Sequence, residues 1–166
     1  MSGVDITVNG DPHALHLAPR TSLADCLRDA LSLTSVHLGC EHGACGACTV
    51  LLDGKAVRAC LSLAVMCDGR AVTTLEGLRD DPRMVALRRA FHENHALQCG
   101  YCTPGMLVMA YDLLGRVPLP TEAAVRDGIA GHLCRCTGYA GIVRAILAAA
   151  AHMHDEAGRR AGPDSA

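Results

Sequence analysis

Residues 39–48 read GCEHGACGAC, a short stretch with three closely spaced cysteines. Its three cysteines, Cys40, Cys45 and Cys48, have the spacing C-x4-C-x2-C, and Cys60 lies twelve residues further on. Glycines alternate with these cysteines, and glycine permits positive φ angles and a close approach of the backbone. Such a loop can turn several backbone N–H groups toward one point and so bind an anion. The stretch therefore predicts a loop that wraps four thiolates around one anionic centre.

The spacing is typical of the plant-type [2Fe–2S] site, in which a distant fourth cysteine completes the ligand set. A structural zinc site is one alternative, but zinc usually takes two short knuckles, and here only Cys45 and Cys48 form one. Buried cysteines without a ligand are another alternative, and they would not need the interleaved glycines. We predict an iron–sulfur site held by Cys40, Cys45, Cys48 and Cys60, with the lone His42 outside the ligand set.

A second cysteine set lies in QCGYCTPG at residues 98–105 and HLCRCTGY at residues 132–139. Two residues that are two apart on an ideal helix point about 200° away from each other. The C-x-C pair can therefore share a centre only in a turn. From spacing alone the set fits zinc or a [2Fe–2S] cluster. Its four members are Cys99, Cys102, Cys134 and Cys136.

A helical pattern follows each pair of this second set. Thr103 is expected to cap a helix that begins at Pro104, a residue favoured at the first helical position. Thr137 is expected to cap the last helix of the chain. Both pairs would then sit at helix N-termini, where the dipole and the free N–H groups favour anionic ligands.

The first half of the chain predicts a small mixed sheet around one helix. Asn9-Gly10 and Asp53-Gly54 are hairpin turn signals, and Thr21 and Ser22 can cap a helix that buries Leu23, Cys26 and Leu27. The expected strands are Val4 to Val8, Ala14 to Leu17, Thr49 to Leu52, Lys55 to Arg58 and Ala71 to Leu75.

The second half has helical periodicity, which predicts a compact four-helix domain and an α+β chain overall. Thr121 is the expected cap of a short helix. The last segment is rich in Ala, Gly, Asp and Arg and is expected to be a mobile tail. The predicted boundaries are a sheet domain over 1–76, a linker over 77–83, a helical domain over 84–152 and a tail over 153–166.

Composition limits the function. The 166 residues are 50% hydrophobic and 19% charged, enough apolar material for a core. Fifteen basic and seventeen acidic side chains nearly cancel, which argues against a nucleic-acid binder held by a basic field. The apolar run Ala145 to Ala151 is far shorter than the roughly 18–20 residues of a membrane span. Without a secretory signal, a soluble, cytoplasmic protein is expected, in a reducing compartment where ten clustered thiols indicate metal.

Both cysteine sets, in this order and spacing, resemble the iron–sulfur subunit of the molybdenum hydroxylases. This family includes xanthine dehydrogenase, aldehyde oxidoreductase and aerobic carbon monoxide dehydrogenase. The resemblance covers roughly residues 4–150, and one departure is His132, where the family usually has Asn. The segments that carry it are GCEHGACGACTVLLDG ending at Gly54, QCGYCTPGM from Gln98 and LCRCTGYAGI from Leu133.

The resemblance implies a β-grasp plant-type ferredoxin domain followed by a four-helix [2Fe–2S] domain. The first cysteine set would hold the cluster nearer FAD, and the second set the cluster nearer molybdenum. By the same likeness, Gln98 and Cys136 would lie against the molybdopterin. Electrons would leave the molybdopterin centre of a large subunit one at a time, pass through both clusters, and reach FAD on a medium subunit.

The chain is then expected to be an oxidoreductase subunit with no substrate site of its own, because it has no room for a molybdenum or FAD domain. A stand-alone ferredoxin and a zinc-bound interaction module are the alternatives. The helical half argues against the first alternative, and the plant-type loop argues against the second. Cys26 is expected in the core, Arg135 at a partner contact, and Tyr101 either over the second cluster or in ordinary packing.

Overall fold

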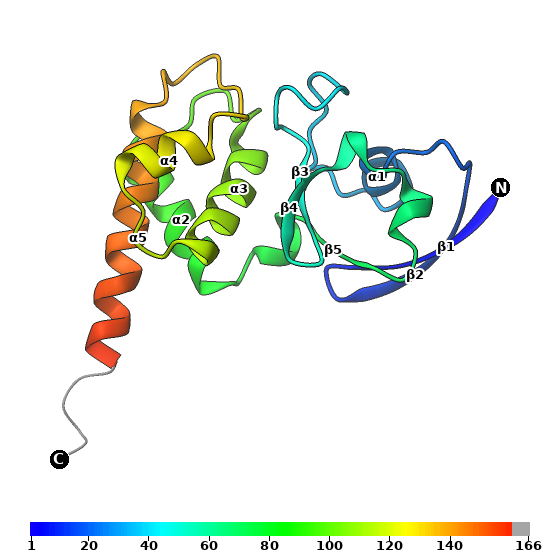
Figure 1. Ribbon diagram of the computed structural model, residues 1–166, viewed down its shortest axis with the longest axis horizontal. Coiled ribbons are helices and arrows are strands. Elements are labelled where there is room, and N and C mark those ends of the chain that lie inside the picture. The colour runs from blue at the N-terminus through cyan, green and yellow to red at the C-terminus, as the bar shows by residue number, and fades with distance from the viewer. Residues whose placement is uncertain (161–166) are drawn as a thin grey trace.

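The computed structural model describes residues 1–160 of the protein, the side chain of Arg160 excepted. Strands and a short helix form one half, and four helices form the other (Figure 1). Within the described residues, no helix combines the length and the apolar character needed to cross a membrane. The strands are β1 (Ser2–Val8), β2 (Asp11–Leu17), β3 (Thr49–Leu52), β4 (Lys55–Arg58) and β5 (Ala71–Thr73), and the helices are α1 (Leu23–Asp25), α2 (Pro82–Glu93), α3 (Thr103–Arg116), α4 (Glu122–Gly128) and α5 (Ala140–Arg160).

The five strands form one mixed sheet in the order β2-β1-β5-β3-β4. Strands β1 and β5 are parallel, and the other neighbours are antiparallel. Both hairpins turn where the sequence predicts, because Asn9 and Gly10 have φ angles of 55° and 93°, and Asp53 and Gly54 of 47° and 78°. Two successive positive φ angles match the right-handed twist of the flanking strands.

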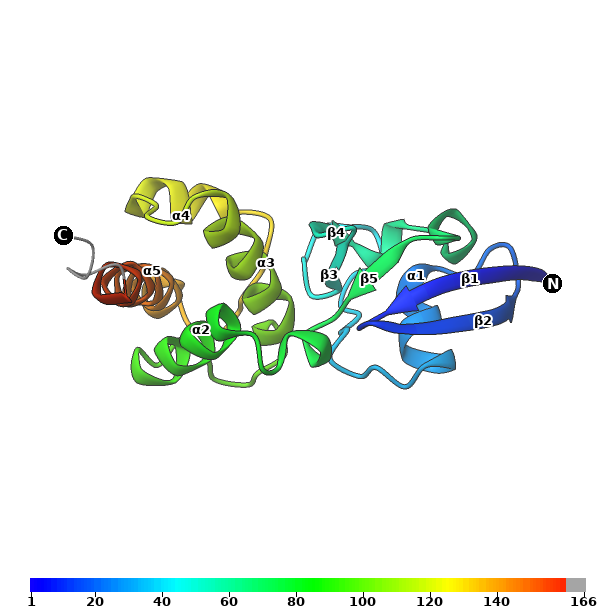
Figure 2. The same cartoon turned by 90° about the horizontal axis from the view of Figure 1, so that it is seen from below.

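Helix α1 packs on the sheet and continues as a π-helical turn, Cys26–Ala30 (Figures 1 and 2). Ser22 caps it, since its Oγ accepts a hydrogen bond from the Asp25 N–H at 3.0 Å. Leu23 and Leu27 are fully buried in the sheet core. The predicted α+β class is therefore confirmed, and the topology agrees with the expected β-grasp arrangement.

Helices α2 to α5 enclose a second apolar core, which includes Phe91, Met106 and Ile146. Thr121 caps α4 as predicted, accepting from the Ala124 N–H at 3.2 Å. Helix α2 begins at Pro82, inside the segment assigned to the linker, because Asp81 caps it and proline suits the first helical position.

Helix α5 runs to Arg160, so the mobile tail expected from residue 153 is wrong for residues 153–160. Two features extend the helix past the predicted end. Met153 packs against the helical core, and His152 lies 3.2 Å from Glu156 one turn later, a spacing that supports helices. Residues 161–166 of the expected tail lie outside the described residues.

Strand β3 joins the two halves, because side chains alternate across a strand. Val50 and Leu52 enter the sheet core, whereas Leu51 enters the helical core. All four residues of β3 are buried, as expected for a strand covered on both faces. Helix α3 packs against the helical side of this strand.

The segment between the halves is held by Glu76. Its carboxylate accepts hydrogen bonds from the Ser35 N–H at 3.0 Å, the Ser35 hydroxyl at 2.5 Å and the Thr74 hydroxyl at 2.5 Å. Burial alone would raise the pKa of Glu76, but the hydrogen bonds from Ser35 and Thr74 outweigh it and lower this pKa. The carboxylate thus ties the interdomain segment to the chain that leads into the first cysteine loop.

We expect Glu76→Gln to destabilise the protein at pH 7 by about 1 kcal/mol, the net value of hydrogen bonds at a surface carboxylate. The lowered folded-state pKa means that this stabilisation is present above the unfolded value of about 4.3. It is lost as the pH falls through the folded pKa. Thermal melting should therefore show a Tm difference of about 2–4 °C at pH 7 that shrinks below about pH 4.

Glu93→Gln is the matched control, because Glu93 is exposed and lies 3.9 Å from Arg89 alone. It should leave the Tm nearly unchanged. A Tm difference for Glu76→Gln that does not depend on pH would contradict the assigned role of the carboxylate.

Candidate iron–sulfur centres

Cys40 and Cys45 of the first set lie on the loop between α1 and β3, and the backbone of this loop is shaped to bind an anion. Gly43 and Gly46 have φ angles of 83° and 77°, and such a left-handed residue turns neighbouring N–H groups toward one point. The Cys45 N–H lies 3.3 Å from Cys40 Sγ. Backbone N–H groups, foremost that of His42, lower the pKa of the Cys40 thiol to about 6. The loop therefore favours a thiolate at Cys40.

The β3–β4 hairpin supplies the remaining two cysteines of this set. Cys48 precedes β3, and Cys60 lies on the 3₁₀ turn Ala59–Leu61 after β4. The Ala59 N–H donates to the Cys48 carbonyl at 3.2 Å, which closes the hairpin. Burial, with smaller contributions from the nearby thiols of Cys60 and Cys45, raises the pKa of the Cys48 thiol to about 11. The structure thus brings all four predicted cysteines together.

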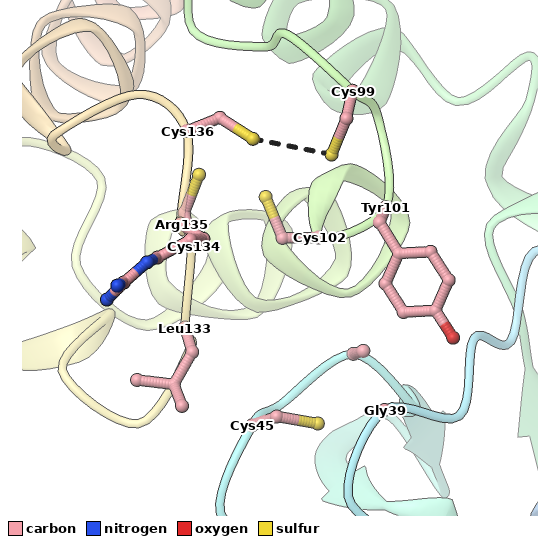
Figure 3. Close-up of a pocket in the computed structure, with 10 residues that line it drawn as sticks. Gly39, Cys45, Cys99, Tyr101, Cys102, Leu133, Cys134, Arg135 and Cys136 are labelled. Carbon is pink, nitrogen blue, oxygen red and sulfur yellow. Dashed lines mark hydrogen bonds between the residues drawn. The ribbon is translucent and has the colours of Figure 1, made fainter.

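The second cysteine set converges between the start of α3 and the loop before α5. Its four sulfur atoms face a common space (Figure 3). Cys136 Sγ lies 3.5 Å from Cys99 Sγ. Burial raises the pKa of the Cys102 thiol to about 12, and the adjoining Cys134 thiol adds to this rise. The C-x-C pair lies in a turn, as its spacing requires.

Hydrogen bonds brace this turn at Cys134. Thr137 Oγ1 donates to Cys134 Sγ at 3.1 Å and accepts from the Tyr139 N–H at 3.2 Å. The Tyr139 hydroxyl accepts from the Cys134 N–H at 2.8 Å and donates to the His132 carbonyl at 3.2 Å. Burial alone would raise the pKa of the Cys134 thiol, but the Thr137 hydrogen bonds outweigh it and lower this pKa. Thr137 therefore hydrogen-bonds to the Cys134 thiol. The prediction that it caps α5 is wrong, because the helix begins three residues later, at Ala140.

The ligand loops of the two sets lie on the same side of the molecule (Figure 1). Cys45 of the first set and all four cysteines of the second line one cavity of about 190 Å³. The Leu133 N–H donates to the Cys45 carbonyl at 2.8 Å, which joins the two ligand loops directly. Tyr101 also crosses between them, since its hydroxyl donates to the Leu38 carbonyl at 2.7 Å. Its ring stacks on His37 with centroids 4.7 Å apart. Tyr101 thus lines the cavity between the two sets (Figure 3).

A buried polar group at the domain boundary was not predicted from the sequence. His132 is only 2% exposed, and burial, followed by the charge of Arg58, lowers the pKa of its imidazole to about 3. The ring is therefore neutral and needs hydrogen-bond partners. Thr49 and Arg58 provide them. The sequence places His132 two residues before Cys134, and no local signal indicates that it lies against the β3–β4 hairpin.

The surroundings of both sets fit a [2Fe–2S] cluster, which takes four thiolate ligands. Among the residues whose contacts the structure describes, Thr103 Oγ1 is the one buried side-chain oxygen or nitrogen without a partner. Thr103 follows Cys102 and was expected to cap α3, but Cys102 is the N-cap and no side chain caps the helix. A sulfur acceptor beside Cys102 would satisfy this hydroxyl. Within residues 1–160, no group of three or more His, Cys, Asp or Glu side chains has the arrangement that would hold a single metal ion.

The other predicted residues divide into exposed and buried groups. Gln98, Arg135 and Cys136 are exposed beside the second set, and Arg135 points away from the four sulfur atoms (Figure 3). Cys26 and Cys67 are buried, and burial raises the pKa of each thiol.

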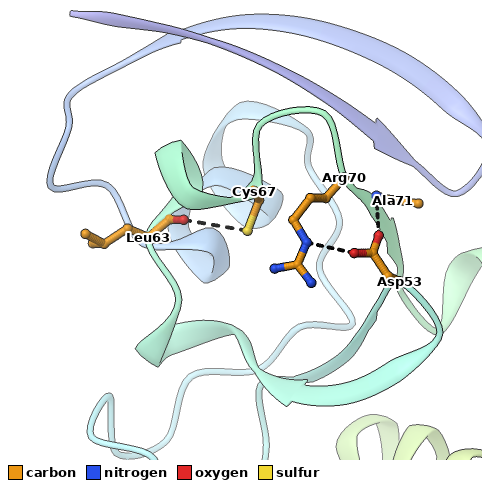
Figure 4. Close-up of polar contacts among 5 residues, drawn as sticks. All are labelled: Asp53, Leu63, Cys67, Arg70 and Ala71. Atoms are coloured by element: carbon orange, nitrogen blue, oxygen red, sulfur yellow. Dashed lines mark hydrogen bonds and ion pairs between the residues drawn. The ribbon is translucent and has the colours of Figure 1, made fainter.

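The Cys67 thiol lies 3.6 Å from the Leu63 carbonyl (Figure 4). Nearby, Arg70 pairs with Asp53 at 2.7 Å. The prediction of a core position for Cys26 is confirmed, and both thiols lie outside the two converging sets.

We expect Gly46→Ala to destabilise the protein more than Gly54→Ala. Both glycines have nearly the same φ, 77° and 78°, so both substitutions carry a backbone cost of about 1–2 kcal/mol. A Cβ at Gly54 meets nothing within 4 Å, whereas at Gly46 it would lie 2.6 Å from His132 Cδ2 and 2.8 Å from the Gly131 carbonyl oxygen. Overpacking adds about 1–3 kcal/mol, so the Tm should fall further by at least 2–4 °C. Equal Tm values would contradict the close contact between the two loops.

Comparison with known proteins identifies both halves. A family described as "2Fe-2S iron-sulfur cluster binding domain" matches residues 6–74, and one described as "[2Fe-2S] binding domain" matches residues 74–147. The nicotine 6-hydroxylase small subunit of Paenarthrobacter nicotinovorans is 48% identical over 155 residues, covering 93% of each chain. The caffeine dehydrogenase subunit gamma of a Pseudomonas species (strain CBB1) is 48% identical over 146 residues, covering 86% of this chain and 87% of the relative.

A solved structure agrees with these relatives. Quinoline 2-oxidoreductase from Pseudomonas putida 86 contains a chain that superposes with a TM-score of 0.86 at 45% identity, with 96% of each chain covered. A match of this extent spans both halves of the chain. The chain therefore belongs to the small iron–sulfur subunits of the molybdenum hydroxylase family, and its two halves are [2Fe–2S]-binding domains.

Proposed function

We propose that this chain is the electron-transfer subunit of a heteromeric molybdenum hydroxylase. It would carry electrons one at a time from a molybdopterin centre on a large subunit to FAD on a medium subunit. The observation that carries the proposal is that two sets of four thiols lie next to each other at the boundary of the two domains, where the Leu133 N–H donates to the Cys45 carbonyl at 2.8 Å. The family membership supports the same role.

The ligand assignment follows the convergence of the thiols. A [2Fe–2S] cluster takes up and releases a single electron, and the protein positions and tunes it. The backbone N–H groups around Cys40 and the Thr137 hydroxyl at Cys134 would stabilise the negative charge of the thiolates. The proposed ligands are Cys40, Cys45, Cys48 and Cys60 for the first cluster, and Cys99, Cys102, Cys134 and Cys136 for the second.

The protein surface beside the second cysteine set exposes different side chains from the surface beside the first set. Gln98, Cys99 and Cys136 are exposed beside the second set, so this side is the one we propose to face molybdopterin, with Gln98 and Cys136 against the cofactor. Leu133, 58% exposed, adds an apolar group to this side.

On the other domain, Leu61 is 63% exposed and packs over Gly43 of the first loop. Large exposed apolar side chains beside a functional site are typical of an interface with another protein. We propose that this side faces the FAD subunit, and that the assembled complex is cytoplasmic.

A stand-alone ferredoxin is not favoured. A free carrier needs only the sheet domain, yet β3 shares its buried residues between the two cores. The relatives that match nearly the whole chain are subunits by name.

Cys45→Ser should abolish or alter one of two S = 1/2 EPR signals of the dithionite-reduced complex and leave the other in place. The reason is that Cys45 belongs to one thiol set only, while the second set keeps its four sulfurs. The wild-type complex should contain about four irons and four sulfides per small subunit, as two [2Fe–2S] centres require.

Cys26→Ser is the matched control, because Cys26 is a buried thiol outside both sets. It should keep both signals and the full iron content. If Cys45→Ser also keeps both signals unchanged, the ligand assignment is wrong; zinc in place of iron at the second set would overturn the proposed function.

Thr137→Val should lower the reduction potential of the second cluster only. The Thr137 hydroxyl donates to Cys134 Sγ, and such a bond stabilises the reduced, more negative cluster. Losing about 1 kcal/mol of hydrogen bonding corresponds to roughly 40 mV for a one-electron couple. Potentiometric EPR titration measures both potentials, and Thr137→Ser should restore the wild-type value. A shift of equal size at both clusters would contradict a local hydrogen bond.

A further inference from the structure

Three polar side chains, His132, Thr49 and Arg58, connect the two domains between the cysteine sets. His132 Nε2 lies 2.9 Å from Thr49 Oγ1 and 3.2 Å from Arg58 Nη1. Arg58 Nη1 donates to Thr49 Oγ1 at 2.7 Å, and Arg58 Nη2 donates to the Gly131 carbonyl at 2.8 Å. We call these three residues the interdomain clasp.

The members of the clasp adjoin cysteines of both sets. Thr49 directly follows Cys48, and Arg58 lies two residues before Cys60. His132 lies two residues before Cys134, on the other domain. Any sliding of one domain over the other would therefore act on the clasp and on the separation of the two sets together.

Arg58 is the donor at the centre of the clasp, because a guanidinium only donates hydrogen bonds. His132 Nε2 and Thr49 Oγ1 both lie within its reach as acceptors. The Thr49 hydroxyl in turn lies 2.7 Å from the Gly46 carbonyl and 2.9 Å from His132 Nε2, so it links the first cysteine loop to the clasp. His132 and Thr49 are 2% and 3% exposed, and a buried polar group left without a hydrogen-bond partner destabilises the fold. Displacing one domain relative to the other would break several of these hydrogen bonds at once, so the clasp holds the two domains in one relative position.

Backbone contacts beside the clasp leave little room for adjustment. The Leu133 N–H to Cys45 carbonyl bond of 2.8 Å is one residue away from His132. A Cβ on Gly105 would lie 2.4 Å from the Gly46 carbonyl oxygen. The first cysteine loop is thus held between the first turn of α3 and the segment 131–133.

We propose that His132, Thr49 and Arg58 are positioning residues that fix the separation of the two cysteine sets, and thereby the rate at which an electron crosses between the clusters. The proposal rests on the proposed function, because it needs a cluster at each set. Electron transfer through protein falls off exponentially with distance, so a small displacement of one loop slows the crossing without removing either cluster.

The test compares Thr49→Val with Thr49→Ser in the purified complex. Valine keeps the shape of threonine and removes the hydroxyl, whereas serine keeps the hydroxyl. Two readouts are needed: the magnetic splitting between the EPR signals when both clusters are reduced, and the rate of intercluster electron transfer after pulsed one-electron reduction. We expect Thr49→Val to keep both signals, weaken the splitting and slow the crossing severalfold, and Thr49→Ser to resemble the wild type.

Tyr111→Phe is the matched control. It removes one hydrogen bond, from the Tyr111 hydroxyl to Asp81 at 3.0 Å, within the helical domain and away from the interface. It should change neither the splitting nor the crossing rate. An equal slowing in this control would overturn the clasp, because the effect would then follow from general loosening.

The remaining outcomes are also decisive. If Thr49→Val keeps both clusters and its splitting and rate equal those of the wild type, the clasp does not set the separation. If Thr49→Val loses iron, the same two measurements on Arg58→Met decide, since Arg58 lies further from its neighbouring cysteine in the chain. A wild-type complex that holds only one cluster would instead overturn the proposed function itself.

Discussion

The structure depends on the direct meeting of two ligand loops, in which the Leu133 N–H donates to the Cys45 carbonyl at 2.8 Å. Each loop must surround thiolates, and each must also come within backbone hydrogen-bonding distance of the other. Glycine makes this possible at Gly46 and Gly105, where a Cβ would lie 2.6 Å from His132 and 2.4 Å from a carbonyl oxygen. Strand β3, which follows the first ligand loop, places buried side chains in both apolar cores and so holds the two domains together. The two domains thus share one boundary, and the two thiol sets lie on either side of it.

Charge is handled differently in the two sets. In the first, the loop backbone itself provides the donors, and its N–H groups lower the pKa of the Cys40 thiol to about 6. In the second, a side chain takes part, because the Thr137 hydroxyl donates to Cys134 Sγ and, with backbone N–H groups, lowers the pKa of the Cys134 thiol. Arg58 is the cation at the boundary, and it hydrogen-bonds neutral partners there. Donors that differ in kind give each domain its own means of tuning a cluster of the same type.

Local sequence signals predicted local structure well. Asn9-Gly10 and Asp53-Gly54 form hairpin turns because these residue types adopt positive φ angles readily, whatever lies around them. Thr121 caps α4 through a hydrogen bond to a residue only three positions away. Thr103 and Thr137 failed as predicted caps because each lies beside a cysteine. The Thr137 hydroxyl donates a hydrogen bond to the Cys134 thiol, and the Thr103 hydroxyl has no hydrogen-bond partner in the protein. The end of α5 was misplaced because Met153 is held by the helical core, a contact that composition does not reveal.

The α+β class, the two sets of four cysteines and the family can be predicted from the amino-acid sequence, because ligand spacing and turn chemistry are properties of short segments. The folded structure is needed to show that the sets lie side by side, that Tyr101 contacts both loops, and that His132 contacts Thr49 and Arg58. These contacts join residues 63 to 83 positions apart in the chain. They arise because β3 and α3 pack together, and packing between distant segments depends on the whole fold and leaves no periodic trace in the sequence.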